Sequence, residues 1–224
     1  MIYFRLFTLF LFFNIPISAH ENINKAGCNN LRNIAVTAWG GQMTDSVLRD
    51  SLTGIGVFET REEFLAGIGF SQNVFKFKKN LLNIELNYFK HFSNTQKGGR
   101  FNQKVKHQKL KEQNFSEFVL GVGFYKELNS SFKIGLIEGI SYLSENSYYE
   151  KTFRSNYSQI LNYLGFEIEK KITDDFHFVS RIHHRSGAFG MFGGVKGGSN
   201  GYLIGLRYVP SIKSGSVNNC NLNK

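Results

Sequence analysis

The most regular pattern in the sequence is an alternation of apolar and polar residues with a period of two. In residues 82–88 the apolar positions are Leu82, Ile84, Leu86 and Tyr88, and Asn83, Glu85 and Asn87 lie between them. A period of two places these sets on opposite faces of an extended strand. Similar alternation occurs in residues 64–70, 118–124, 160–168, 176–182 and 202–208. The pattern predicts β-strands with one apolar face and one polar face.

Together these patterns predict eight strands, near residues 33–42, 57–70, 80–92, 115–126, 133–142, 158–170, 176–186 and 201–209. The connections between them alternate in length. Those at 43–56, 93–114, 143–157 and 187–200 are long, and those at 71–79, 127–132 and 171–175 are short. Outer-membrane barrels have this asymmetry, with short periplasmic turns and longer surface loops. We therefore expect an all-β chain that forms an eight-stranded antiparallel transmembrane β-barrel of the outer membrane, with side chains filling its interior.

Such a barrel turns its apolar face to lipid and its polar face to the lumen. The lipid-facing set should include Leu82, Leu86, Leu120, Phe124, Leu164, Phe166, Phe178 and Leu206. The lumenal set carries charges of both signs, on Glu85, Glu167, Glu169, Arg181, Arg185 and Arg207. A turn at 171–175 would pair residue numbers that sum to about 346, setting His177 opposite Glu169 and Arg181 diagonal to Glu167. We expect these charges to pair with one another. The glycine pairs at 54–56, 67–69 and 121–123 are interpreted as small residues packed inside a narrow barrel.

The N-terminus has the features of an export signal. Arg5 precedes an apolar run from Leu6 to Phe13, and Ala19 is a small residue just before a polar stretch. Pro16 and the shortness of the run disfavour an N-terminal hydrophobic helix. We expect a signal peptide at residues 1–19, a single barrel domain at 20–209 and a polar periplasmic tail at 210–224.

Composition excludes several classes of protein. The chain has 224 residues and is 15% aromatic, which is too rich in aromatic residues for a disordered coil, and no segment has the roughly 18 apolar residues of a helical span. Cys28 and Cys220 alone cannot build a disulfide-dense scaffold or a cysteine zinc site. They lie just before the first strand and just after the last, so they are able to form one periplasmic disulfide, and two free thiols are the alternative.

The net charge of +10 gathers partly in one long connection, which contains Lys97, Arg100, Lys104, Lys106, Lys109 and Lys111. A basic loop at the outer surface is able to contact lipopolysaccharide phosphates, and a merely solvated loop is an alternative at least as good. No nucleic-acid partner is expected.

Other motifs give little support for cofactor or metal chemistry. His183 and His184 are adjacent and therefore point to opposite faces of a strand, and the glycine pairs lack the third glycine of a dinucleotide fingerprint. The G-x-S-x-G string at 197–201 leads into a strand, whereas a nucleophile elbow follows one. We expect no metal and no cofactor.

One constellation fits nucleophilic chemistry. His184 and Ser186 are two residues apart, so the imidazole and the hydroxyl lie on one face of a strand, as a serine and its base require. Both continue the apolar series Phe176, Phe178 and Ile182, and so they point to lipid, where polar groups are costly and usually functional. With a periplasmic N-terminus this strand runs outward, which places the pair beside the leaflet that contains lipid A.

At these residues the chain resembles the PagL-type lipid A 3-O-deacylases, outer-membrane barrels whose serine hydrolase site faces the lipid. The resemblance lies mainly in the last ninety residues and in the H-x-S element. It implies hydrolysis of a lipid A acyl ester, with Ser186 as nucleophile and His184 as general base. The stretches 181–187 and 193–200 also look like uncharacterised barrel proteins of proteobacterial type. Gly187 departs from the family pattern, which has asparagine after the serine, and no acid follows Ser186 as a third catalytic member.

Pairing across the predicted turn supplies a hypothesis for the missing member. A sum of about 346 sets Asn162 opposite His184, and a sum of about 300 across the preceding loop sets Asn162 opposite Glu138. We therefore predict a polar row of Glu138, Asn162 and His184 on the lipid face, with Ser186 beside it. Its amide or carboxylate would accept the imidazole proton.

Two functions remain open from the sequence. One is an outer-membrane esterase that acts on lipid A or another outer-leaflet lipid. The other is a noncatalytic small barrel whose basic loops stabilise the membrane surface or bind a partner, in which case the polar row merely contacts headgroups. A carboxylate or amide within reach of His184 would favour the first function.

Overall fold

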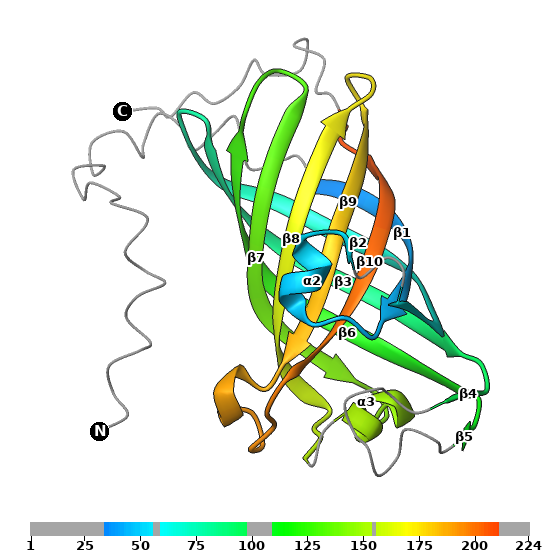
Figure 1. The fold of residues 1–224 in the computed structure, drawn as a ribbon. Coiled ribbons are helices and arrows are strands. Elements are labelled where there is room, and N and C mark those ends of the chain that lie inside the picture. Colours follow the sequence, from blue (N-terminus) through cyan, green and yellow to red (C-terminus); the bar gives the residue numbers. More distant parts are fainter. Residues whose placement is uncertain (1–33, 56–58, 98–108, 154–155, 211–224) are drawn as a thin grey trace, which may run out of the picture.

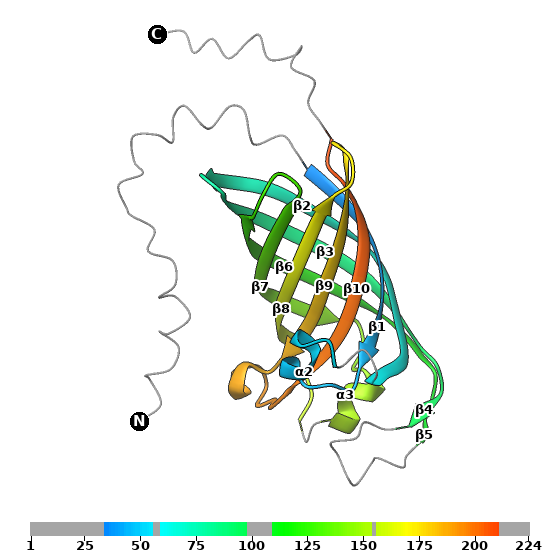
Figure 2. The ribbon, with the colours of Figure 1, turned by 45° about the horizontal axis from the view of Figure 1, so that its top comes forward.

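The protein forms a closed β-barrel (Figures 1 and 2). A computed structural model describes residues 34–55, 59–97, 109–153 and 156–210. Its eight wall strands are β1 (Ile34–Thr44), β2 (Thr60–Phe77), β3 (Asn80–Ser93), β6 (Gln113–Glu127), β7 (Phe132–Leu143), β8 (Ile160–Lys171), β9 (Phe176–Ser186) and β10 (Gly198–Tyr208). Consecutive wall strands pair antiparallel, and β1 pairs with β10 to close the barrel. The predicted all-β, eight-stranded antiparallel fold is confirmed.

The remaining elements are short and belong to the long connections. They are α2 (Leu48–Leu52), the hairpin of β4 (Gln96–Lys97) and β5 (Lys109–Leu110), α3 (Tyr148–Phe153) and the 3-10 turn η4 (Ala188–Gly190). In Figure 1 these elements lie at or near one end of the barrel, and the short turns lie at the other end. The predicted alternation of long and short connections is therefore also present.

Strand β2 runs further than the sequence pattern predicts. The alternation ends near Phe70, but the strand continues to Phe77 and leaves a turn of only Lys78 and Lys79 before β3. A bulge between Asn73 and Phe75 shifts the register by one residue, which returns Phe75 and Phe77 to the outside. The bulge hides the continuation because it breaks the period of two.

The outer wall is apolar and the lumen is polar. Leu86, Leu120, Phe124, Phe178 and Leu206 are exposed on the outside, and Leu82, Leu164 and Phe166 are half-exposed there. The charged side chains predicted to be lumenal, Glu85, Glu167, Glu169, Arg181, Arg185 and Arg207, are all buried. An exterior of this kind is stable only against lipid, and a closed barrel leaves no strand edge unpaired within it. The chain is therefore an outer-membrane β-barrel, as predicted.

No helix within the described ranges has the length and apolar character needed to cross a bilayer.

The short turns of outer-membrane barrels face the periplasm. In the half of the lumen nearest these turns, the buried charges form ion pairs. Arg207 Nη1 lies 2.8 Å from Glu167 Oε1, and Arg181 Nη2 lies 2.8 Å from Glu85 Oε2. Arg181 Nε also donates to Glu167 Oε2 at 2.8 Å, and His177 Nδ1 contacts Glu169. A buried charge without a partner is strongly destabilising, and here Arg181 and Arg207 each contact two carboxylates.

Lumenal glycines provide the space that large side chains occupy. A Cβ atom at Gly69 would lie 2.7 Å from Nε1 of Trp39, and one at Gly67 would lie 2.6 Å from the ring of Phe89. This agrees with the packing predicted for these glycines. For Gly54 the prediction is wrong, because this residue follows α2 in a loop at φ 80°, a left-handed conformation that favours glycine.

Helix α3 inserts side chains into the outer mouth of the lumen. The ring of Tyr149 is buried, its hydroxyl donates to Asp45, and the guanidinium of Arg61 lies 4.7 Å from the ring centre. Burial raises the pKa of Tyr149, and the neighbouring Asp45 carboxylate raises it further, so this hydroxyl keeps its proton.

Several predictions lie outside the described residues. They are the signal peptide at 1–19, the two cysteines Cys28 and Cys220, the tail beyond residue 210, and Arg100, Lys104 and Lys106 of the basic connection.

Candidate functional site

The connection between β1 and β2 folds over the outside of the barrel. In Figures 1 and 2, α2 lies outside the wall in the half of the barrel that carries the long connections, and it contacts β9 and β10. Two hydrogen bonds fix it there: Asn200 Nδ2 donates to the Ser46 carbonyl at 2.7 Å, and Tyr202 Oη donates to the Ser51 carbonyl at 3.1 Å. His184 points outward from β9, yet only 7% of its surface is exposed. The segment therefore shields part of the lipid-facing wall.

Beneath this segment, His184 contacts a buried asparagine on the neighbouring strand. His184 Nδ1 lies 2.6 Å from Asn200 Oδ1, and the two residues are directly opposite in the β9–β10 ladder. The Ser46 carbonyl can only accept a hydrogen bond, so the Asn200 nitrogen must face it and the Asn200 oxygen must face the imidazole. The shared hydrogen bond is then donated by Nδ1. A neutral imidazole protonated at Nδ1 has an unprotonated Nε2, the state a general base requires.

The edge of the imidazole that carries Nε2 lies next to Gly198, the β10 residue opposite Ser186. Ser186 pairs with Gly198, and a Cβ atom at Gly198 would lie 3.0 Å from His184 Nε2. Directly opposite side chains in an antiparallel ladder have Cβ atoms about 4.5–5.5 Å apart. Glycine at 198 thus leaves room for the ring, and Nε2 lies over the β10 position that pairs with Ser186.

The predicted position of Asn162 is wrong by two residues. Asn162 lies directly opposite Ser186, and Leu164 lies opposite His184. The last β8–β9 pair is Lys171 with His177, and the turn is closed by the Ile172 N–H, which donates to the Phe176 carbonyl at 2.9 Å. The turn is therefore centred one residue later than predicted. As a result, each β9 residue pairs with a β8 residue that lies two positions later in the chain than predicted.

Glu138 and Asn162 are nevertheless in contact. Asn162 Nδ2 donates to Glu138 Oε1, although Ile140 is the residue directly opposite Asn162. The predicted row is broken between Asn162 and His184, because Leu164 separates them along the lipid face. Asn162 instead borders Ser186 on the β8 side.

Asn200 is the functional candidate that sequence reasoning missed. The sequence could have pointed to it. Tyr202, Ile204 and Leu206 alternate on the outward face of their strand, and Asn200 is the polar residue that continues this alternation. The glycine-rich connection before β10 hid this signal, since its length does not fix the β9–β10 register.

The departure at Gly187 has a local cause. A Cβ atom at this position would collide with the backbone of Val195, and the Gly187 N–H donates to the Gly197 carbonyl at 3.2 Å. An asparagine does not fit there without a shift of the loop. The N–H that follows the candidate nucleophile is already used in closing the loop.

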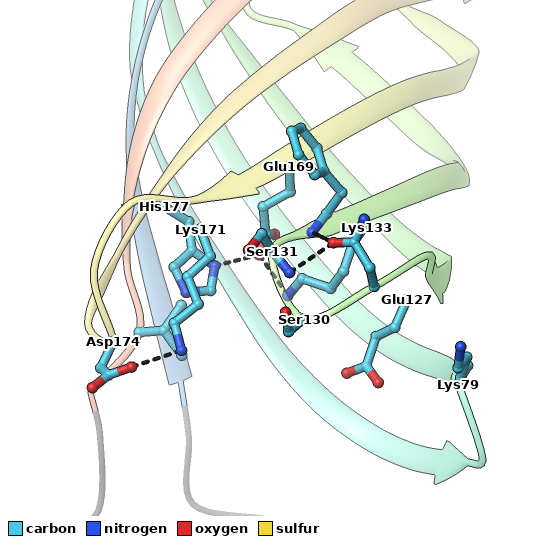
Figure 3. A pocket seen from close by; sticks show the side chains of 12 residues that line it. Lys79, Glu127, Ser130, Ser131, Lys133, Glu169, Lys171, Asp174 and His177 are labelled. Carbon is cyan, nitrogen blue, oxygen red and sulfur yellow. Dashed lines mark hydrogen bonds and ion pairs between the residues drawn. The ribbon is translucent and has the colours of Figure 1, made fainter.

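A cavity of the described structure lies away from these residues. It has a volume of about 430 Å³ and opens at the periplasmic end, where Lys133, Lys171, Glu169, Asp174 and His177 are among its lining residues (Figure 3). Lys133 Nζ lies 2.5 Å from Glu169 Oε1, and Lys171 Nζ lies 2.7 Å from Asp174 Oδ1. Its charges are largely paired, which is typical of a solvated barrel mouth. No group of three or more metal-ligating side chains is placed to hold a metal ion within the part of the chain that the structure describes.

Comparison with known proteins finds similarity of structure alone. No family model matches the chain, and no curated protein does. Similar solved structures include the N-terminal β-barrel domain of Pseudomonas aeruginosa OprF, at 8% identity and a TM-score of 0.48, covering 81% of this chain and 99% of that one. Ail, the attachment invasion locus protein of Yersinia pestis solved with the heparin analogue sucrose octasulfate, is 8% identical with a TM-score of 0.45, covering 79% and 95%. A de novo designed transmembrane β-barrel is 10% identical with a TM-score of 0.41, covering 80% and 95%.

Proposed function

We propose that the protein is an outer-membrane esterase that hydrolyses an acyl ester of lipid A, with Ser186, His184 and Asn200 as its site. The observation that carries the proposal is the pair of hydrogen bonds made by Asn200, to His184 Nδ1 and to the Ser46 carbonyl. They set the imidazole in the tautomer that leaves Nε2 basic, and Nε2 lies next to Gly198, the residue opposite Ser186. A polar residue that merely contacts water or headgroups at the rim of the barrel does not need these two hydrogen bonds.

The chemistry follows from these positions. Nε2 of His184 takes the Ser186 proton as Oγ attacks the ester carbonyl, and the imidazolium then returns a proton to the departing sugar oxygen. Water hydrolyses the acyl-enzyme in a second, equivalent step. Asn200 holds the ring by a neutral hydrogen bond, as the asparagine of a Cys-His-Asn site does. Asn162, anchored by Glu138, borders Ser186 and is assigned to the polar part of the substrate.

The location supports a lipid as substrate. His184 and Ser186 point to the outer wall, at the end of β9 that carries the long connections. A substrate reaches this side of the wall by lateral diffusion within the outer leaflet, which contains lipid A.

Mass spectrometry of lipid A, from cells with and without the protein, tests the proposal. We expect the wild type to remove an acyl chain, and Ser186→Ala or His184→Ala to remove none while the barrel stays folded. Asn162→Ala should weaken the reaction without abolishing it. Ser180→Ala is the matched control, because Ser180 also points outward from β9 but lies nearer the periplasmic end.

Cleavage by the Ser186→Ala variant would reject the mechanism. Unchanged lipid A in cells with the wild type would favour the alternative, a noncatalytic barrel that stabilises the surface or binds a partner.

A further inference from the structure

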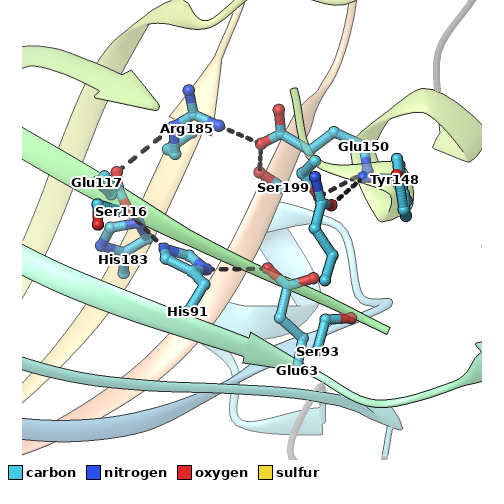
Figure 4. A network of polar contacts seen from close by, with 12 residues as sticks. Glu63, His91, Ser93, Ser116, Glu117, Tyr148, Glu150, His183, Arg185 and Ser199 are labelled. Atoms are coloured by element: carbon cyan, nitrogen blue, oxygen red, sulfur yellow. Dashed lines mark hydrogen bonds and ion pairs between the residues drawn. The ribbon is translucent and has the colours of Figure 1, made fainter. Parts of the chain in front are cut away.

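A lumenal carboxylate lies directly behind the proposed site, on the inner side of the barrel wall. Glu150 belongs to α3 and is buried. Its Oε1 accepts a hydrogen bond from Arg185 Nη1 at 2.5 Å and another from Ser199 Oγ at 2.7 Å (Figure 4). Arg185 and Ser199 are opposite each other in the β9–β10 ladder. One oxygen atom therefore joins the two strands from the inside.

The two residues that Glu150 joins are the chain neighbours of the proposed site. Arg185 lies between His184 and Ser186, and Ser199 directly precedes Asn200. Side chains alternate across a strand, so a contact made inside at one residue fixes the backbone from which the outward neighbours project.

The ends of both strands need such support. β9 ends at Ser186 and β10 begins at Gly198, and a long loop with several left-handed glycines joins them. Strand ends next to long loops open more readily than strand centres. The hydrogen bond between His184 and Asn200 crosses the ladder near this open end.

We infer that Glu150 is a positioning residue, which holds β9 and β10 in the register that joins His184 to Asn200. This inference rests on the proposed function for its catalytic consequence. Its structural content, the alignment of the imidazole with the amide, does not depend on activity.

Glu150 can be altered without leaving a buried cation alone. Arg185 Nε also donates to Ser141 Oγ at 2.7 Å and lies 3.4 Å from Glu117 Oε1, and Arg185 Nη2 donates to the Gln159 carbonyl at 3.1 Å. Replacement of Glu150 by leucine keeps the approximate size of the side chain and removes the oxygen atom that accepts both hydrogen bonds. We therefore expect the barrel to fold.

The experiment compares Glu150→Leu with a matched control, Glu167→Leu, in the full-length protein in detergent. Glu167 is a buried lumenal carboxylate that also joins β9 to β10, through Arg181 and Arg207, but nearer the periplasmic end. A misplacement of about 1 Å costs up to a hundredfold in rate, so we expect kcat to fall about tenfold in Glu150→Leu with KM nearly unchanged. Glu167→Leu should fold and keep the wild-type kcat, because Arg181 keeps Glu85 as a partner and Arg207 keeps Glu169. Ser199→Ala, which removes one of the two contacts, should give an intermediate loss.

A second measurement does not need activity. The Nδ1 proton of His184 should give a low-field NMR signal, assigned by its loss in His184→Gln. We expect this signal to broaden or vanish in Glu150→Leu and to persist in Glu167→Leu.

The outcomes separate the two proposals. An inactive wild type would reject the esterase, and the NMR signal would then decide the role of Glu150 by itself. A wild-type kcat in an active Glu150→Leu, an unaltered His184 signal, or equal losses in Glu167→Leu would each overturn the inference. If Glu150→Leu fails to fold, the same readouts in Ser199→Ala decide it.

Discussion

Asn200 is the residue on which the proposed chemistry depends most directly. Its oxygen accepts from His184 Nδ1, and its nitrogen is held by the Ser46 carbonyl. Asn200→Leu keeps the approximate volume but removes both hydrogen bonds, so the imidazole loses its fixed tautomer. Because general base catalysis contributes 10²–10⁴-fold, we expect ester cleavage to fall about a hundredfold. Initial rates with purified protein and lipid A check this. A variant as active as the wild type would remove Asn200 from the site.

The absence of a side chain at Gly198 leads to a prediction about the space that the His184 ring occupies. A Cβ atom at this position would overlap the imidazole of His184, whereas one at Gly40, which faces the same way from β1, would meet nothing within 4 Å. Gly198→Ala should displace the ring from Ser186 and lower the rate about tenfold or more, since near-attack geometry is lost. Gly40→Ala should cleave at the wild-type rate. Both variants should migrate faster on a gel when unheated than when heated, as a folded barrel does. Equal rates of ester cleavage in the two variants would contradict the placement of the His184 ring.

At the scale of elements, a residue of α3 makes the stability of the folded protein depend on pH. The raised pKa of Tyr149 means that the folded state holds this proton more tightly than the unfolded state, whose tyrosines titrate near 10.0. The resulting stabilisation is complete below that pH and is lost as the pH rises through the folded pKa. We expect the stability of the wild type to decline above about pH 10 more steeply than that of Tyr149→Phe.

Urea unfolding in lipid vesicles at several pH values measures this difference. At neutral pH the Tyr149→Phe variant should be less stable, by about 1–3 kcal/mol, because it loses the hydrogen bond to Asp45. Parallel pH profiles of the two proteins would show that Tyr149 does not carry the effect.

The elements also show where the sequence is informative. Strand positions followed from the period of two, because one side of the wall faces lipid and the other a charged lumen. The registers did not follow, since a turn centred one residue later moves each pair by two, as Asn162 and His184 show. The placement of α2 against β9 and β10 was not predictable either. Its five residues are too few to reveal a packed face, and the Ser46 contact to Asn200 uses a backbone carbonyl.

The whole molecule should behave as a small filled barrel. Buried ion pairs and aromatic side chains occupy the lumen, and all wall strands are paired. We expect a β-type circular dichroism spectrum in detergent and faster gel migration of the unheated protein, because the closed wall resists unfolding by detergent. A helical spectrum, or one mobility with and without heating, would contradict the fold.

The wall is uneven in height, and this sets the depth at which the protein meets its membrane. β9 and β10 have 11 residues each, whereas β2 has 18 and β6 has 15. At about 3.3 Å per residue and a tilt of about 40°, 11 residues rise roughly 28 Å, close to the roughly 25 Å apolar band of such barrels. Ser186, the last residue of β9, therefore lies where acyl chains join their headgroups. Under the proposed function, the ester within reach is one attached directly to the sugar, and an ester further down an acyl chain passes below the serine.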